Sequence, residues 1–274
     1  MLDSLFAGLA LDALLIRMAA TALVVMAVSW AVGAFGPLVG GALAGLPMIL
    51  GPGFYFMAQQ SPAPFVAQAA SYALLSLCAT QLFLLAYIAT ARHGSPWLSL
   101  LAAVGGWLAG ALLSQLLPAH PVGGMLLFML VTAGCLRLSR RYVTPMTPTK
   151  GVPGWGLLLL RGLLAGALVA AVTTASRWLG PSGSGFLLAF PIGYTVVSVT
   201  IHQKYGNAGV IATLRSALLG TLSLAGFAAA LALTITRMPQ LAALAVALAS
   251  SLLITVVLVL RRRGRTAAAA APRR

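Results

Sequence analysis

The sequence predicts an all-α polytopic membrane protein of about nine transmembrane helices, in two inverted-topology repeats with Pro/Gly-broken helices. Three observations predict this fold: the composition, the length of the apolar runs, and an internal repeat. Apolar residues make up 61% of the 274 residues and charged residues only 7%, and the mean hydropathy is +1.01. Because soluble domains carry about 25% charged residues, this composition excludes a soluble enzyme.

The apolar runs are each about 20 residues long, which is the length that an α-helix needs to cross a bilayer. Strands of transmembrane β-barrels instead alternate apolar and polar residues over about 10 positions. The runs are therefore interpreted as helices. Cutting them at polar, Pro and Gly clusters gives the predicted spans 13–34, 38–59, 64–91, 97–117, 120–137, 156–178, 183–203, 207–236 and 240–260.

Two basic segments set the predicted organisation and orientation. Residues 138–155 form a basic, turn-rich loop, and residues 261–274 form a basic tail with an Ala run. The tail has no face that could pack in a core, so we expect it to be disordered. Because loops rich in Lys and Arg stay in the cytoplasm, both segments are placed there and the N-terminus outside. Residues 1–137 then hold the first repeat plus a linking helix, and residues 156–260 hold the second repeat.

The repeat emerges when the chain is shifted on itself by 144 residues. Arg17 then aligns with Arg161, Gly41 with Gly185, and Gln59 with Gln203. Gly36-Pro37 also aligns with Gly180-Pro181. Five predicted crossings separate equivalent spans, so the two copies point in opposite directions, as in many secondary transporters. Shared composition among apolar helices is the alternative explanation of the matches.

Pro47 and Pro191 are aligned by the same shift and lie roughly ten residues, or roughly 15 Å, into the second and seventh spans. Proline removes a backbone hydrogen bond inside a helix, and freed polar groups at that depth need protein or a water-lined cavity. We expect two broken helices whose half-helix N-termini direct partial positive charge to a shared site. An ordinary proline kink with glycines for close packing is the alternative.

Polar residues on helix faces provide the remaining candidates for a binding site. Tyr194, Ser198 and His202 recur every four residues and so share one face, and the third span has a similar stripe with Ser76 and Thr80. Such faces line a path or join helices by hydrogen bonds. His202 is either a proton carrier or an interfacial histidine near Lys204. The full candidate substrate-binding set is Gly41, Pro47, Gly51, Tyr55, Gln59, Gln68, Tyr72, Gly185, Pro191, Tyr194, Ser198, His202 and Arg215.

Arg215 lies some eight residues into the eighth span, whereas Arg161 is expected to reach the cytoplasmic interface by snorkelling. Arg215 could pair with helix C-terminal carbonyls, with lipid phosphate or with an anionic substrate. The sequence has no Glu and only two Asp, which argues against cation cages. It has no catalytic motif, and Cys78 and Cys135 lack metal-ligand spacing. We therefore expect no enzyme activity, no cofactor and no metal site.

The stretch from Gly185 to Pro191, followed by His202 and Gly206, resembles the core of GlpM-type small inner-membrane proteins, and the repeat suggests two such units fused. In the first copy the equivalents of the His and of the last Gly are Ala58 and Pro62, so half of the pattern is missing there. That family is associated with alginate production in some bacteria. The resemblance implies a location in the bacterial inner membrane.

These features favour a secondary transporter, exporter or flippase-like protein that moves an anionic or amphipathic solute by alternating access between the repeats. The alternative is a non-transporting scaffold or assembly protein of an envelope-polymer pathway. The net charge of +15 predicts contact with anionic lipid headgroups at the basic loop and tail. It does not predict nucleic-acid binding, because no soluble region is large enough to present a basic groove. The oligomeric state stays open, a homodimer included.

Overall fold

The structure is a computed structural model that describes residues 11–34, 47–142 and 154–270. This part of the chain forms helices and contains no strand, so the predicted all-helical membrane fold is confirmed. The elements are α2 (Leu11–Ala34), α4 (Leu50–Ala58), α5 (Ala63–Thr90), α6 (Pro96–Ser114), α7 (Pro121–Ser139), the 3-10 turn η1 (Arg140–Tyr142), α8 (Trp155–Thr174), α9 (Ser176–Leu188), α10 (Ile192–Thr234) and α11 (Gln240–Ala270).

Seven helical stretches of the described residues are long and apolar enough to cross a membrane, so the predicted number of nine is not reproduced. The described part of the predicted span 38–59 is the short helix α4, with only 9 residues. Helices α9 and α10 form a single apolar stretch, Ser176–Thr234, where the sequence predicts two spans. The difference therefore arises at the short helix α4 and at the junction of the predicted spans 183–203 and 207–236.

Several helices begin where a proline can be accommodated. Helix α6 starts at Pro96, and the Ser95 hydroxyl accepts a hydrogen bond from the Leu98 amide at 3.3 Å. Helix α7 starts at Pro121 in the same way, after His120. Proline suits a first turn because its missing N–H would have no partner inside the helix. Both starts lie within one residue of the predicted positions.

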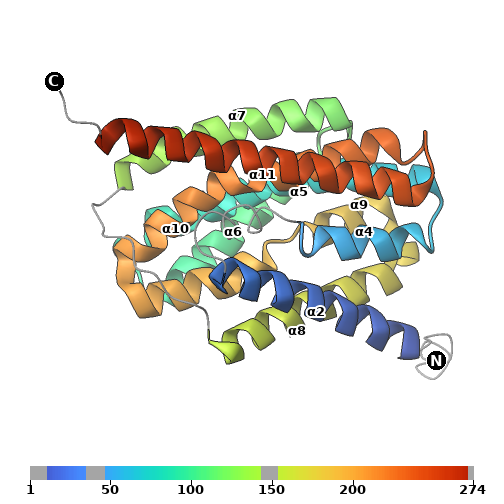
Figure 1. Cartoon of the computed structure of the whole chain (residues 1–274), viewed down its shortest axis with the longest axis horizontal. Helices are drawn as coiled ribbons and strands as arrows, with labels where there is room; N and C mark the ends of the chain where they lie inside the picture. Colours follow the sequence, from blue (N-terminus) through green and yellow to red (C-terminus); the bar gives the residue numbers. More distant parts are fainter. Residues whose placement is uncertain (1–10, 35–46, 143–153, 271–274) are drawn as a thin grey trace.

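Helix α5 is the central element of the fold. It contacts α6, α7, α9 and α10, and most of its side chains are buried. Figure 1 shows α2 and α8 side by side and running in opposite directions, since α2 starts near the N-terminus and α8 starts at the other end of the molecule. The outer helices α6, α7 and α11 expose many leucines, as expected of surfaces that face lipid.

Helix boundaries recur at a constant spacing. After a kink at Gly206, α10 continues over residues 207–234, which is the range of α5 shifted by 144 residues. Helix α6 begins at Pro96 and α11 begins at Gln240, again 144 residues later. Helix α5 packs on α6 as α10 packs on α11. The boundaries therefore follow the spacing of the sequence matches.

The basic segments differ from the prediction at their edges. Helix α11 continues to Ala270, so the expected disordered tail is corrected to helix over residues 261–270. Alanine and arginine are both strong helix formers, and here they extend an existing apolar helix. Helix α7 and turn η1 likewise carry the chain to Tyr142. The rest of the predicted loop up to residue 153, and residues 271–274, lie outside the described residues.

Candidate functional site

The helix formed by α9 and α10 is interrupted at Pro191, as predicted. Helix α9 ends at Leu188, α10 begins at Ile192, and Pro191 has φ −77° and ψ 46°. The Phe190 amide donates to the Leu187 carbonyl at 3.1 Å, but Pro191 has no amide hydrogen to continue the ladder. In Figure 1 this break lies between α9 and the first part of α10, well inside the molecule.

Helix α4 begins close to that break. Its first residue, Leu50, follows Pro47 by three positions, and the Gly51 amide donates to the Pro47 carbonyl at 2.7 Å. A Cβ atom on Gly53 would lie 2.7 Å from the Leu188 side chain, so α4 lies closely against the end of α9 and a larger residue there would require the Leu188 side chain to move. Helices α4 and α10 therefore begin in the same region.

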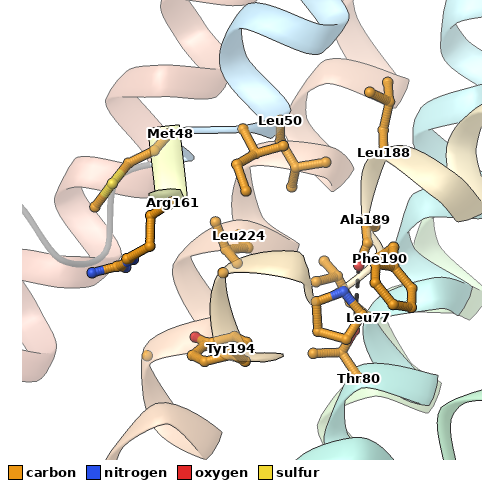
Figure 2. A pocket seen from close by; sticks show the side chains of 14 residues that line it. Met48, Leu50, Leu77, Thr80, Arg161, Leu188, Ala189, Phe190, Tyr194 and Leu224 are labelled. Carbon is orange, nitrogen blue, oxygen red and sulfur yellow. Dashed lines mark hydrogen bonds between the residues drawn. The ribbon is translucent and has the colours of Figure 1, made fainter. Parts of the chain in front are cut away.

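Helix α5 satisfies backbone carbonyls at the end of α9. The Ser76 hydroxyl donates to the Phe186 carbonyl at 2.9 Å, and the Thr80 hydroxyl lies 3.3 Å from the Ala189 carbonyl (Figure 2). A Cβ on Gly185 would collide with the Ala69 carbonyl oxygen, so this glycine permits the close approach. Two members of the polar stripe on α5 thus join helices, and Thr80 also lines the cavity described next.

A cavity of about 150 Å³ lies where the two half-helices begin. Figure 2 shows Met48 and Arg161 on one side of it and Phe190 and Thr80 on the other. It is called the central cavity below. The described residues that line it are Met48, Ile49, Leu50, Leu77, Thr80, Arg161, Leu188, Ala189, Phe190, Pro191, Gly193, Tyr194, Gly220 and Leu224.

Arg161 gives the central cavity its charge. It lies on α8, its side chain is half-buried, and its buried Nε atom makes no hydrogen bond to any described residue. None of the described lining residues has a carboxylate. Figure 2 shows the Arg161 side chain at the edge of the cavity, with its guanidinium nitrogens beside Met48 and turned away from Phe190 and Thr80. That it also reaches the cytoplasmic interface by snorkelling stays a prediction. An anion in the cavity would meet a guanidinium group and two helix N-termini.

Two members of the predicted site set, Pro191 and Tyr194, line the central cavity. Pro47 is buried next to Met48, and Gly51 lies in the first turn of α4. The Ser198 hydroxyl donates to the Tyr194 carbonyl at 2.6 Å, within its own helix.

Other predicted residues lie elsewhere. Tyr55, Gln59 and Gln68 are exposed, and Gly41 lies outside the described residues. Arg215 is half-buried on α10, and its Nε atom has no partner among the described residues, but it does not line the central cavity.

His202 is a buried, hydrogen-bonded residue, 6% exposed. Its Nδ1 atom lies 3.2 Å from the Tyr87 hydroxyl, and its Nε2 atom lies 3.1 Å from the Asn207 side-chain oxygen. The Asn207 amide in turn donates to the Arg92 carbonyl at 3.1 Å. This network joins the end of α5 to both sides of the kink at Gly206, which is a structural role that neither sequence interpretation included.

Several residues that line the cavity are missing from the predicted binding-site set, above all Arg161, Met48 and Leu224. The 144-residue shift was the signal that could have found part of them, because it aligns Leu224 with Thr80 and Arg161 with Arg17. The position of Arg161 along its predicted span did not indicate that it lines a cavity, because the distance along a helix does not tell which face a side chain occupies.

Comparison of the chain with known protein families, curated proteins and solved structures gives no match. The resemblance to GlpM-type proteins therefore stays a prediction. The proposed function is based on the geometry of the central cavity.

Proposed function

We propose that the protein is a secondary transporter of the bacterial inner membrane that moves a small anionic solute, or the anionic head of an amphipathic one, by alternating access between two inverted repeats. The N-terminus lies outside and the C-terminus in the cytoplasm. One observation carries the proposal: two half-helix N-termini and Arg161 meet at one cavity whose described lining residues include no carboxylate.

The α2–α8 pair supports the inverted repeat. A Cβ on Gly162 would lie 3.1 Å from the Ala22 carbonyl oxygen, and a Cβ on Gly166 would contact the Met18 carbonyl oxygen. The 144-residue shift aligns Ala22 with Gly166 and Met18 with Gly162. The two contacts therefore correspond to each other with the two helices exchanged. Antiparallel helices with contacts of this kind are related by an approximate two-fold axis, as inverted repeats require.

The central cavity supports the same arrangement, because equivalent positions of the two copies line it. Ile49 pairs with Gly193 at the shift of 144 residues, and Thr80 pairs with Leu224. A cavity on the axis between repeats is where transporters of this plan hold their substrate, and rocking of one repeat against the other exposes it to either side.

The size and charge of the cavity favour a small anion. A cavity of about 150 Å³ accommodates a ligand of about the size of benzene. A carboxylate or phosphate group fits that space and is stabilised by helix N-termini and arginine. A longer solute would have to leave its apolar part outside the cavity.

The test uses the full chain in proteoliposomes and measures uptake of acetate, benzoate, methyl phosphate and dodecyl phosphate. We expect at least one anion to be taken up, and Arg161→Gln to weaken its binding at least about tenfold, because a charge-assisted hydrogen bond is lost. The matched control is Arg237→Gln, an exposed arginine between α10 and α11.

Failure of all four anions to bind or cross would reject the transport proposal. Co-purification of a partner in fixed stoichiometry, without any flux, would then favour the scaffold alternative. Equal anion binding by Arg161→Gln and by the unmodified chain would reject the role of Arg161.

A further inference from the structure

A second hollow lies between α6, α9 and α5. Its volume is about 510 Å³, and it opens toward the outer surface, because Leu108 and Leu112 in its wall are 51% and 64% exposed. It is called the lateral groove below. Its lining combines these leucines with the polar side chains of Tyr72, Gln115 and Ser182 and with the ring of Trp107, so it is amphipathic.

The end of α9 and the break after it separate the lateral groove from the central cavity. Phe186 and Leu187 line the groove, whereas Leu188 and Phe190 line the cavity. The Trp107 ring in the groove meets the Phe190 ring edge to face, with centroids 4.9 Å apart and an interplanar angle of 84°. The Trp107–Phe190 contact therefore joins the lining of the groove to the lining of the cavity.

Trp107 also has an unsatisfied polar group. The side chain is only 7% exposed, and its Nε1 atom has no hydrogen-bond partner among the described residues. Buried polar groups normally have partners, and a donor left without one is unfavourable. An anionic head group that passes through the groove would accept a hydrogen bond from Trp107 Nε1 and remove this penalty while it lies there.

We propose that the lateral groove admits a single-chain anionic amphiphile from the lipid phase and that the Trp107–Phe190 contact is the gate between the groove and the central cavity. This inference deepens the proposed function and rests on it. The anionic head enters the central cavity near Arg161, and the apolar chain stays along the leucines of the groove. The division matches the two volumes, because the cavity holds only a group of about benzene size.

The backbone allows this gate to move. Phe190 lies in the irregular segment between α9 and α10. Gly180 and Gly206 flank residues 181–205. They have φ of 65° and 68° with extended ψ values, which is a backbone region open almost only to glycine. A Cβ atom at either position would meet nothing within 4 Å, so these glycines are required by the backbone and not by packing. They are natural hinges for residues 181–205.

The test measures access to the cavity without measuring transport. Cys78 and Cys135 are replaced by Ala, and a reporter is introduced as Gly220→Cys, where a Cβ meets nothing within 4 Å. The chain is placed in lipid nanodiscs, and the rate of modification by dodecyl methanethiosulfonate is followed by mass spectrometry. We expect Phe190→Ala and Trp107→Ala each to raise the rate about fivefold, as loss of an aromatic contact predicts.

The control is Leu101→Ala, an exposed leucine on α6 outside the groove lining, which should leave the rate unchanged. Phe190→Leu provides a milder variant should Phe190→Ala fail to fold, and it should raise the rate by a smaller factor. In the reporter chain that keeps Trp107 and Phe190, dodecyl phosphate should slow the modification of the introduced cysteine, whereas inorganic phosphate and dodecyl maltoside should not.

Unchanged rates in both Phe190→Leu and Trp107→Ala would overturn the gate. Protection by inorganic phosphate but not by dodecyl phosphate would overturn the amphiphile and assign access from water. A gate that behaves as expected in a chain that moves no anion would reject the transport proposal alone, so the two failures are distinguishable.

Discussion

Arg17 on α2 and Arg161 on α8 occupy equivalent positions of the two copies but have different surroundings. The Arg17 guanidinium lies 3.5 Å from the Thr173 hydroxyl and 3.2 Å from the Thr174 hydroxyl. Arg161 lines the central cavity, and its Nε atom has no hydrogen-bond partner among the described residues. One arginine is thus held by the protein, and the other is available to a ligand.

The 144-residue shift aligns the two threonines that hold Arg17 with residues of a different kind. The equivalents of Thr173 and Thr174 in the first copy are Ser29 and Trp30. The Ser29 hydroxyl makes a long contact of 4.0 Å with the Met48 sulfur. In the proposed repeat both cations lie at aligned positions, and the two threonines of α8 give hydrogen-bond partners to Arg17, whereas the Arg161 Nε atom is left for the proposed site.

The largest expected effect comes from breaking the helix pair that carries both arginines. In Gly166→Ala the new Cβ would contact the Met18 carbonyl oxygen, which cannot move aside as a side chain could. Overpacking of this kind lowers the free energy of unfolding by about 1–3 kcal/mol. The measurement is the apparent melting temperature in detergent micelles. Gly156→Ala on the same helix is the control, because its Cβ would meet nothing within 4 Å, and equal melting of the two variants would contradict the close α2–α8 packing.

The second prediction tests the comparison directly, by replacing each arginine with methionine. Arg17→Met should destabilise the protein by about 1–2 kcal/mol, because two threonine hydroxyls lose their charged donor. Arg161→Met should leave stability unchanged or raise it, because an uncompensated charge is removed from a partly buried position. Melting temperatures of both variants in the absence of added anions provide the measurement. An equal loss in both would show that Arg161 is structural.

Much of the fold could be predicted from the sequence, because apolar runs of membrane length have sharp edges. The predicted starts at 97 and 120 lie within one residue of α6 and α7. The predicted spans 183–203 and 207–236 meet at Gly206, where φ of 68° and ψ of −171° place a kink between two helices that follow each other without a loop. Apolar patterning reports burial in lipid and contains little information about a change of direction at one glycine.

The site could be predicted only in part. Pro191 identified the break between α9 and α10, since proline acts through the backbone and needs no partner. The residues before Pro47 lie outside the described part of the chain, so a broken helix there stays a prediction. The surroundings of Arg161 and His202 could not be predicted, because they depend on what other helices place beside these residues, namely the cavity for Arg161 and Tyr87 for His202. A single sequence does not contain those neighbours.

A third prediction concerns a network that only the second copy has. The equivalents of His202 and Asn207 in the first copy are Ala58 and Ala63, which cannot join the helices by side-chain hydrogen bonds. Asn207→Ala removes the bonds to His202 and to the Arg92 carbonyl, and it should destabilise the protein by about 1 kcal/mol. Gln203→Ala, at an exposed position of the same helix, should have no effect on melting. Identical melting curves for the two variants would show that this hydrogen-bond network does not stabilise the kink at Gly206.

The fourth prediction is a substitution in the cavity that should change stability least and anion binding strongly. Gly193→Ile gives the second copy the residue that the first has as Ile49, and the Cβ at this position would meet nothing within 4 Å. The added carbons fill a cavity of only about 150 Å³, so anion binding should be lost. The free energy of unfolding should change by less than about 0.5 kcal/mol, because better helix propensity in the first turn of α10 offsets lost freedom of the side chain.

Gly134→Ile on α7 is the matched control, because its Cβ also meets nothing within 4 Å and it does not line the cavity. Isothermal titration with the anion that gives flux in proteoliposomes measures binding in both variants. Retained binding in Gly193→Ile would place the anion elsewhere on the molecule. Loss of binding in Gly193→Ile alone would show that the difference between Gly193 and Ile49 leaves room for the ligand, just as the loss of threonine partners leaves Arg161 to bind it.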